Sequence, residues 1–458
     1  MQETNAINRR TFVSYTAATA GVLALAGCAD TDGTDTDDTD TDDTAEDDLE
    51  TMPEFLEVED PPDAVYVPTH REAMRMLEPV EAGDMMVAPM LSYPHPFWIV
   101  AGTGADSLER TDPEDDRGVH MMFTVWDRET GVVLPVDDGA QIQVERDGES
   151  VGSPVSPWTM ISQEMGFHFG DNVSLPEDGT YTVEVTLPPL STRTTGDLEG
   201  RLEESATATF EFTYDDEFRH EVVGGVEYFD EDIWGERGAL EPMDHGEHGH
   251  GDDGHDHGDH DDHGDHEEGH NHDHEDHDDH ADHDGHDDEH DHDDGHDHGD
   301  HDEHDHHAVP YSALPEIDAY PGTILVDPEE GDVPDVTEDL PESGDARFLA
   351  TVLESDHRLA EAEAYLLVSP RTPYNRVPLA DMSMTATVER DGEVLEESAL
   401  EQTIDGTYDL HYGASVPELE AGDTVTIETE TPPQVARHQG YETAFLEMPL
   451  LELQVPEQ

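Results

Sequence analysis

The chain has 458 residues, of which 117 are Asp or Glu and 18 are Lys or Arg, so its formal net charge at pH 7 is -99. This charge excludes nucleic acid and anionic membrane surfaces as binding partners, because both repel a polyanion. The single cysteine, Cys28, excludes an intrachain disulfide and any zinc site built on several thiolates.

The acidic residues are spread over the whole chain, a composition that resembles proteins of salt-loving archaea. In molar salt the Debye length falls to about 3 Å, so like charges are screened and an acidic surface mainly keeps the protein hydrated. The charge therefore indicates a halophilic habitat more than an activity.

Residues 1–28 are predicted to be an export signal. The letters NRRTFV at residues 8–13 precede a short apolar run that ends in LAGC at residues 25–28. This pattern resembles a twin-arginine (Tat) signal joined to a lipoprotein box, in which Cys28 becomes the lipidated first residue of the mature chain. No other stretch has 18 consecutive apolar residues, so we expect the lipid anchor to be the only membrane contact, on the extracellular face.

Residues 29–51 form an acidic low-complexity stretch, predicted to be a disordered tether because it has too little apolar surface to fold. From residue 52 to 243 the sequence changes to short apolar runs such as MMFTVWD and TYTVEVTL, separated by turn signals such as RETG and PEDG. Alternating runs at a spacing of roughly ten residues are typical of an all-β sandwich.

Residues 244–308 form a tract of His and Asp that holds 23 of the chain's 31 histidines. Neutral imidazole binds zinc, copper, nickel and iron, so we predict a disordered metal-binding linker that holds several ions with modest affinity and loses them below about pH 6. A solvated linker with incidental histidines is the alternative, although the acidic tether has no histidine. The closely spaced candidate ligands are His255, His257, His272, His274, His290, His292, His296, His298, His304, His306 and His307.

Residues 309–458 repeat the first β region. MMFTVWDRETGVVLPVDDGAQIQVERDGE matches YLLVSPRTPYNRVPLADMSMTATVERDGE, and FHFGDNV matches LHYGASV, at an offset of 243 to 244 residues over about seventy positions. The chain is therefore predicted to be all-β, with two Ig-like sandwich domains, 52–243 and 309–458, separated by the tract.

Two pairs of histidines recur in the copies. His168 stands between aromatic residues ahead of a glycine, and His411 is its counterpart; His95 and His357 precede the matched strands. From the residues alone, a metal ligand and a histidine that hydrogen-bonds a turn or loop both remain open for each of them.

The pattern Gly-x-His-aromatic-Gly-x-Asn after a methionine, followed by a Gly-x-Tyr-x-Val strand and TTGDLEGRLEESATATFEFTY, resembles the bacterial periplasmic ferrous-iron transport lipoproteins. The resemblance covers about residues 118–214 and, less closely, 365–443. It implies Ig-like sandwiches that work beside iron permeases. It also implies a site for copper or a similar divalent ion near a dimer interface, made by a turn His, an upstream Met, an early-strand Glu and a late His.

Carried onto this chain, the resemblance makes His168 the turn His and Met160 the Met, with Met165 as a rival because Met160 is one residue farther away than in the family. His411 fits in the second copy, where no Met lies just upstream, and His438 takes the place of the late His. The early Glu has no clear counterpart in the first copy. These departures suggest that the copies divided the ligand set or changed metal.

We therefore expect an exported, lipid-anchored protein that binds iron, copper or zinc and supports metal acquisition beside a membrane permease. The two domains are expected to pair within the chain or to mediate a homodimer. No nucleophile motif, phosphate loop or second cysteine points to an enzyme. The alternative is a cell-surface Ig-like binding or structural protein whose tract buffers metal passively.

Overall fold

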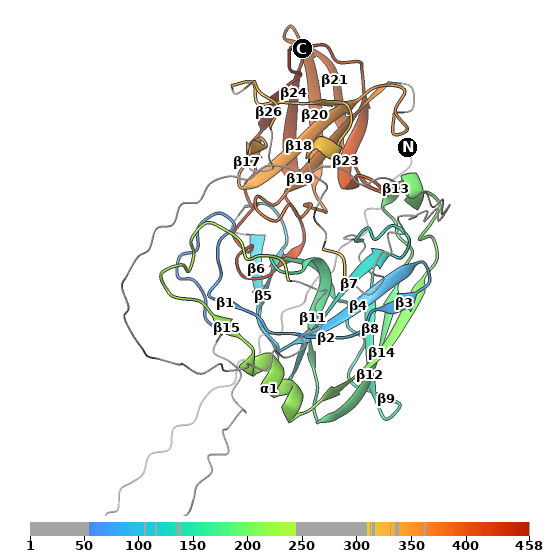
Figure 1. Cartoon of the computed structure of the whole chain (residues 1–458), viewed down its shortest axis with the longest axis vertical. Coiled ribbons are helices and arrows are strands. Elements are labelled where there is room, and N and C mark those ends of the chain that lie inside the picture. The colour runs from blue at the N-terminus through green and yellow to red at the C-terminus, as the bar shows by residue number, and fades with distance from the viewer. Residues whose placement is uncertain are drawn as a thin grey trace, which may run out of the picture. The chain divides into compact units, whose positions relative to one another are not determined.

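The computed structural model describes residues 55–457 except 105–106, 115–116, 135–138, 244–308, 312, 314–316, 330, 335–338 and 361–362. The expected export signal with Cys28, the acidic tether and the His/Asp tract lie outside the described residues. The all-β prediction is confirmed: in the part that the structure describes, strands are joined by loops, two short 3-10 turns and one α-helix (Figure 1). None of the helices described there is long and apolar enough to cross a membrane.

The first half of the chain builds a sandwich from a nine-stranded and a four-stranded sheet. The nine-stranded sheet has the order β2-β4-β7-β11-β10-β25-β5-β6, and β3 also pairs with β4. Its strands are β2 (Arg75–Met76), β3 (Val80–Ala82), β4 (Met85–Ser92), β5 (Phe97–Val100), β6 (Leu108–Thr111), β7 (Gly118–Asp127), β10 (Trp158–Ser162), β11 (Gly166–Ser174) and β25 (Ala436–Arg437). The facing sheet has the order β14-β12-β8-β9 and consists of β8 (Gln141–Arg146), β9 (Glu149–Ser150), β12 (Gly179–Leu187) and β14 (Ala206–Tyr214).

Alternation of side chains sets the core of this sandwich. Along β12 and β14 every second residue is buried, as expected for strands with one wet face. After β14, helix α1 (Asp216–Gly224) begins at Asp215, whose carboxylate accepts a hydrogen bond from Phe218 N at 2.9 Å and caps the first turn. The short pair β1 (His70–Arg71) and β15 (Glu227–Tyr228) follows, and it ties the segment after α1 to the start of the fold.

The second half builds a second sandwich, coloured orange to red in Figure 1. One sheet has the order β13-β22-β23-β19-β18-β16, with β17 also paired to β18; the other has the order β21-β20-β24-β26. Their strands are β13 (Arg193–Thr195), β16 (Thr323–Ile324), β17 (Glu342–Ser343), β18 (Ala346–Leu353), β19 (Ala364–Arg371), β22 (Glu401–Asp405), β23 (Asp409–Val416), β20 (Ser383–Arg390), β21 (Glu393–Ala399), β24 (Thr424–Thr431) and β26 (Leu451–Gln454). The 3-10 turns are η2 (Gly196–Leu198) and η3 (Ile317–Ala319).

The two sandwiches exchange one short strand each. Strand β25, from the second half, pairs in parallel with β10 of the first; strand β13, from the first half, pairs in parallel with β22 of the second. Met160 faces Ala436 in one pair and Thr403 faces Arg193 in the other. The same offset of 243 residues relates Met160 to Thr403 and Arg193 to Ala436, so the exchange follows the internal repeat.

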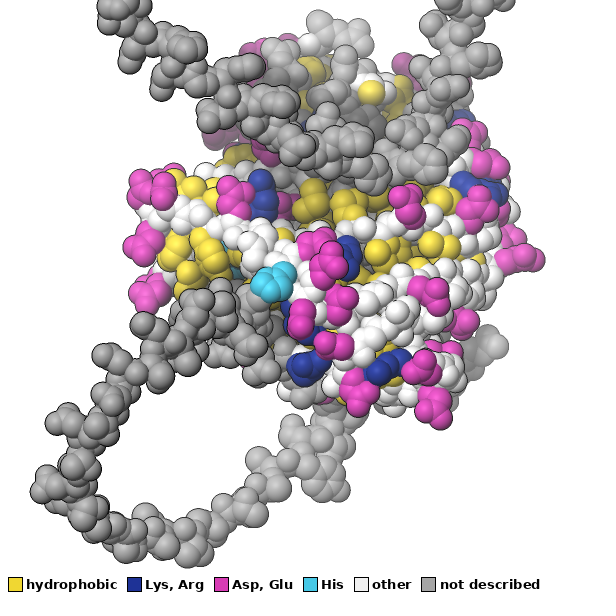
Figure 2. Space-filling view, turned by 60° about the horizontal axis from the view of Figure 1, so that its bottom comes forward, with side chains coloured by type: hydrophobic (Ala, Val, Ile, Leu, Met, Phe, Trp, Pro, Cys, Tyr) yellow, Lys and Arg dark blue, Asp and Glu magenta, His cyan; other side chains and the backbone are white. Residues whose placement is uncertain are grey.

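Charged residues at the surface are mainly acidic, and on the face shown in Figure 2 the acidic side chains are spread widely, with fewer basic ones beside them. Several surface arginines are paired with carboxylates: Arg219 contacts Asp178 at 2.9 Å, and Arg146 contacts Glu177 at 2.5 Å. Such exposed pairs contribute little to stability, especially in salt.

A buried carboxylate supports the β13–β22 exchange. Asp405 is fully buried at the end of β22, accepts hydrogen bonds from Thr407 N and from Thr195 of β13, and pairs with both ends of the Arg358 guanidinium at 2.5 Å. Burial alone would raise the pKa of Asp405, but its bonds to Arg358 and Thr195 outweigh burial and hold this pKa below its usual value.

We expect Asp405→Asn to lower the free energy of unfolding at pH 7 by about 2 kcal/mol, because Arg358 loses its partner while remaining partly solvated. The sign of the pH dependence follows from the lowered pKa. Asp405 contributes its full stability above the unfolded-state pKa of about 3.9 and loses it as the pH falls through the folded-state value. The gap between variant and wild type should therefore narrow below pH 4 in thermal unfolding followed by circular dichroism.

Glu452→Gln, at an exposed position of β26, is the matched control and should unfold like the wild type at both pH values. An Asp405→Asn penalty that is as large at pH 3 as at pH 7 would show that the ion pair is not its cause.

Candidate metal centre

Three neighbouring strands place polar side chains on the outer face of the nine-stranded sheet. In β7, Val119, Met121, Phe123 and Val125 enter the sandwich core, so His120 and the next even positions point the other way. The same alternation puts His168 and Gly170 of β11 and Met160 of β10 on this outer face. The register pairs Met160 with His168 and Asn172 with His120. The sheet alone thus gathers two imidazoles and a thioether.

Segments from outside these strands cover that face and add further ligands. Glu72 lies between β1 and β2, His95 lies between β4 and β5, and His438 directly follows β25. Ring centroids lie 4.1 Å apart for His95 and His120, 5.1 Å for His95 and His438, and 5.0 Å for His168 and His438. The four histidines are at most 6% exposed, so they form one buried cluster.

Hydrogen bonds fix how these rings are oriented. The Nδ1 of His168 lies 3.1 Å from Gly166 O, that of His95 lies 3.1 Å from Pro96 O, and that of His120 lies 3.1 Å from Asn172 Oδ1. Each acceptor is an oxygen, so each Nδ1 carries the proton, and in a neutral ring this leaves a lone pair on Nε2. Acceptors of this kind commonly orient histidines that bind metals.

A short contact inside the cluster joins the ring nitrogens of two histidines. Nε2 of His168 lies 3.1 Å from Nε2 of His438, while Nδ1 of His438 lies 3.5 Å from Glu72 Oε1. If His438 donates its one proton to Glu72, two lone pairs face each other. With metal–nitrogen bonds of about 2.0–2.1 Å, two nitrogens 3.1 Å apart subtend about 100° at a shared ion, which is an ordinary coordination angle. A cation bound by both rings would remove the repulsion between the two lone pairs.

Glu72 supplies the negative charge of the cluster. Its Oε2 lies 3.0 Å from His95 Nε2, and ligand atoms of Glu72, His95 and His438 all lie within 4.8 Å of one another. Burial alone would raise the pKa of Glu72, but the adjacent His95 and His438 outweigh burial and keep this pKa well below its usual value. Burial opposes charge on His95, yet Glu72 raises its pKa. Without a metal, a proton on His95 balances the carboxylate.

Burial keeps the other imidazoles neutral. It lowers the pKa of His168 to about 3 and the pKa of His438 below its ordinary value. Burial, together with His95 and His438, lowers the pKa of His120 well below normal. Metals bind neutral imidazole, so the fold holds these rings in the form that binds metal.

Gly170 leaves space beside the sulfur of Met160. A Cβ added at Gly170 would lie 3.0 Å from Met160 Sδ and 3.2 Å from His120 Nε2, and this nitrogen has no hydrogen-bond partner among the described residues. A thioether and an unpartnered imidazole nitrogen therefore line the same small space. This donor set suits borderline and soft ions such as copper.

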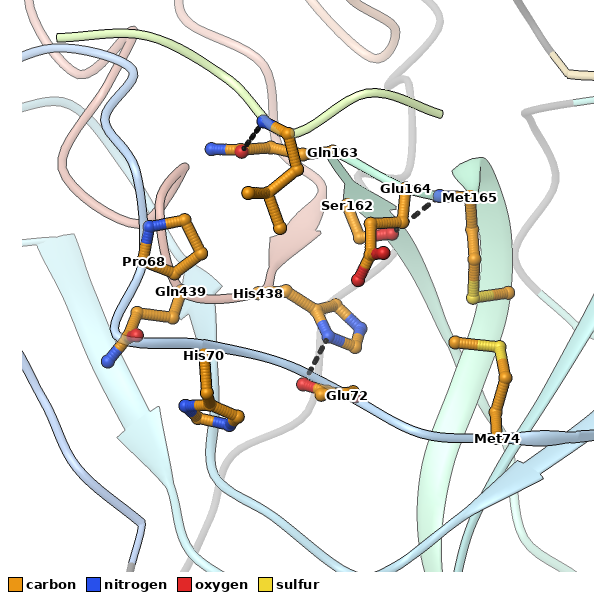
Figure 3. A pocket seen from close by; sticks show the side chains of 11 residues that line it. Pro68, His70, Glu72, Met74, Ser162, Gln163, Glu164, Met165, His438 and Gln439 are labelled. Atoms are coloured by element: carbon orange, nitrogen blue, oxygen red, sulfur yellow. Dashed lines mark hydrogen bonds and ion pairs between the residues drawn. The ribbon is translucent and has the colours of Figure 1, made fainter. Parts of the chain in front are cut away.

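A pocket opens onto the cluster from the side of Glu72 and His438 (Figure 3). It holds about 30 Å³, enough for one water-sized particle. Figure 3 shows the sulfurs of Met74 and Met165 close together on one wall, and Met165 also packs with Met90 and Met122. The full lining consists of Pro68, His70, Glu72, Met74, Ser162, Gln163, Glu164, Met165, Leu240, His438 and Gln439.

Buried polar contacts hold the loop that carries His438. Arg437 is fully buried and donates to three carbonyl groups of its own loop, on Pro433, Tyr441 and Ala444. Burial lowers the pKa of Arg437 to about 9. Gln439 accepts from Thr69 N at 2.9 Å, which ties the loop to the segment that leads to Glu72.

The repeat-related position in the second half is built differently. His411 faces Thr403 where His168 faces Met160, and Tyr365 takes the register position of His120. The space that Gly170 leaves open is filled at Gly413 by the Tyr365 hydroxyl. His411 donates from Nδ1 to Asp409 O and lies 3.4 Å from Tyr365 Oη; burial lowers its pKa to about 4.

Of the residues named from the sequence, the structure brings His95, His168, His438 and Met160 together and puts Met165 at the pocket. It places His411 and His357 in the second sandwich, outside this cluster; His357 lies 3.2 Å from Tyr408 Oη and accepts from Leu359 N. Cys28 and the histidines of the tract lie outside the described residues. Sequence reasoning missed Glu72 and His120. Alternation in GVHMMF signals that His120 leaves the core, but no local pattern marks Glu72.

We expect Gly170→Ala to weaken metal binding by at least about tenfold, because the new methyl group occupies the space beside Met160 Sδ and His120 Nε2. Gly170 is not among the glycines with positive φ, so alanine should fit the backbone and the fold should persist. Isothermal titration with Zn²⁺ and with Cu²⁺, on chains whose tract histidines are serine, measures the effect. Gly224→Ala, where an added Cβ meets nothing, is the control; equal affinity of both variants would disprove the role of this space.

We also expect the two described sandwiches to bind one ion, not two. In a chain whose 23 tract histidines are replaced by serine, mass spectrometry of the metal content should find about one tightly held ion per chain. His168→Ala should abolish it, because it removes a ligand. His411→Ala should leave it in place, because Tyr365 and Asp409 already satisfy that ring. Two ions per chain, or a loss caused by His411→Ala, would contradict this asymmetry.

Residues 318–454 match a family described as a domain of unknown function, DUF7350. A search of curated proteins found no match. The chain is similar to solved structures of FetP from uropathogenic Escherichia coli strain F11. A copper-bound variant is 16% identical, with a TM-score of 0.22, over 31% of this chain and 97% of FetP. The protein as isolated after expression in the periplasm is 17% identical, with a TM-score of 0.21, over 31% of this chain and 95% of FetP.

Proposed function

We propose that this chain is an exported transition-metal-binding protein that holds one ion in the buried cluster of Glu72, His95, His120, His168 and His438. The observation that carries the proposal is the 3.1 Å contact between Nε2 of His168 and Nε2 of His438 in a cluster almost closed to solvent. Hydrogen bonds to Nδ1 already orient three of the rings, so little has to move when an ion binds.

The donor atoms limit which ions fit. Four imidazoles, one carboxylate and one thioether favour copper, zinc and ferrous iron over magnesium and calcium, which prefer oxygen ligands. This matters in brine, where the hard cations are in large excess. The thioether of Met160 favours copper among the three, whereas Glu72 and His95 suit zinc and iron equally well.

Export and a role in acquisition complete the proposal. The signal-like residues 1–28 support a location on the outer face of the membrane, with Cys28 as the lipid anchor, and a membrane permease is the expected recipient of the ion. We assign no enzymatic activity. In the alternative, a surface protein whose tract buffers metal passively, the buried cluster would hold no ion of its own.

The proposal can be tested by comparing the affinities for Cu²⁺, Zn²⁺ and Mg²⁺ in a chain whose 23 tract histidines are replaced by serine. We expect the protein to retain Cu²⁺ and Zn²⁺ during gel filtration in molar NaCl with excess Mg²⁺. Electron paramagnetic resonance of the Cu²⁺ form should show coupling to several imidazole nitrogens. His438→Ala should lower the affinity at least about tenfold and remove one nitrogen coupling, whereas His220→Ser, exposed on α1, should change neither. Displacement of the ion by Mg²⁺, or no retained ion, would favour the passive surface protein.

A further inference from the structure

A group of methionines lies beside the buried histidines, on the outer face of the nine-stranded sheet. Five side chains pack together there, and within the part of the chain that the structure describes this cluster contains methionine alone. Met90, Met122 and Met165 are at most 2% exposed, and the half-buried Met74 and Met76 pack against them. The core on the opposite face is instead a mixture of aliphatic and aromatic residues. Five of the chain's 15 methionines are thus gathered in one small volume.

Strand register brings these thioethers together. Met76 of β2 is opposite Met90 of β4, and Met90 is opposite Met122 of β7. Residues directly opposite each other on neighbouring strands share a face of the sheet, with Cβ atoms about 4.5–5.5 Å apart. Met122 is in turn opposite Gly170 of β11, where an added Cβ would lie 3.2 Å from Met122 Cγ. The row of thioethers therefore crosses three strands and ends at the open space beside the histidines.

Two members of this methionine cluster line the pocket. Met74 and Met165 both contribute to its wall, and Figure 3 shows their side chains extending toward each other, with the two sulfurs close together. The pocket holds about 30 Å³, so one ion without its full hydration shell fits. A methionine that only fills space in a core needs no access to a pocket. This access distinguishes Met74 and Met165 from ordinary packing residues.

The sulfur atoms and the charge of the pocket together favour a soft monovalent ion. Thioethers are soft ligands that suit Cu(I), whereas magnesium and calcium prefer oxygen. Thioethers are also neutral, so other groups must balance the charge of a bound ion, or its desolvation is costly. Glu164 is paired with Arg71 at 2.7 Å, and Glu72 is the other carboxylate of the lining. One such carboxylate balances one positive charge better than two.

We propose that Met74 and Met165, packed against Met90 and Met122, form a second metal site that binds Cu(I) at the pocket. The ligands are thioethers, so the site differs in chemistry from the cluster of Glu72 and the four histidines, and no ligand atom is shared between the two. The inference goes beyond the proposed function, because the methionines would bind a soft ion whether or not the histidines hold a divalent one. Binding transfers no electron and breaks no covalent bond.

Methyl signals of the methionines test the second site residue by residue. The protein is the full chain labelled with ¹³C at the methionine methyl groups, with Cys28 and the 23 tract histidines changed to serine to remove competing ligands. Nuclear magnetic resonance follows a titration with Ag(I), a stable analogue of Cu(I), in molar sodium nitrate because chloride precipitates silver. Met74→Leu, Met165→Leu and Met384→Leu assign the three signals, and leucine is close enough to methionine in volume to preserve the fold. Met384, in the core of the second sandwich, is the internal control.

We expect the Met74 and Met165 signals to shift together and to saturate with one equivalent of Ag(I), while the Met384 signal stays in place and excess Mg²⁺ shifts none of them. In Met74→Leu, the Met165 signal should need at least about tenfold more Ag(I) to reach its half-way point.

Two results would overturn the inference: Met74 and Met165 signals that do not respond to Ag(I), or a Met165 response that Met74→Leu leaves unchanged. The first needs no variant beyond those used for assignment, so it decides the matter even if a leucine variant folds poorly. Neither result bears on the histidines, whose binding of Cu²⁺ and Zn²⁺ is measured separately, so failure of this site and failure of the proposed function are distinguishable.

Discussion

The candidate metal centre depends on the parallel pairing of β25 with β10. This contact is short, with Met160 facing Ala436 and Ile161 facing Arg437, but it joins parts of the chain more than 270 residues apart and continues in the hydrogen bond from His438 N to Ile161 O. Without it, the sheet would present His120, His168 and Met160 on a face with no late histidine. Ordering so remote a contact costs conformational entropy, and the buried hydrogen bonds of Arg437 and Gln439 help to offset that cost. Losing one of these bonds would leave a buried polar group without a partner, which is strongly destabilising.

Burial of the cluster disfavours charge on its imidazoles, and the same burial leaves their neutral nitrogens available to a metal ion. Removing water makes an isolated charge unfavourable, so His120, His168 and His438 stay neutral, and Glu72 is tolerated as an anion because His95 and His438 lie beside it. A divalent ion in place of a proton would attract the Glu72 carboxylate more strongly and would be coordinated by the lone pairs of the imidazole nitrogens. Because the histidines are so little exposed, an ion could reach the cluster from solvent only on the side of the pocket. The residues that line the pocket would therefore influence which ions enter.

Sequence reasoning reached the fold and part of the site. Alternating runs and turn signals were sufficient for the all-β fold, since strand periodicity is a local property. His168, His95 and His438 could be named because they recur in the copies or fit a family pattern. Glu72 could not be found: it lies outside the repeat, and only tertiary packing brings it to His95. The choice between Met160 and Met165 also depended on register, because β10 and β11 pair Met160 with His168, whereas Met165 falls in the turn between them.

The repeat preserved the strand exchange but not the chemistry around it. At the second exchange, Thr195 occupies the position related to His438, Thr403 replaces Met160, and Tyr365 replaces His120. Thr195 donates to Asp405, and Asp405 holds Arg358, so an internal cation fixed to the chain satisfies the carboxylate there. One exchange is thus stabilised by a permanent ion pair, while the other keeps lone pairs that only a proton or a metal ion can satisfy. An ion pair within the chain needs no supply from outside, so the β13–β22 exchange can hold the two sandwiches together whether or not the cluster beside β25 has bound the ion that we propose for it.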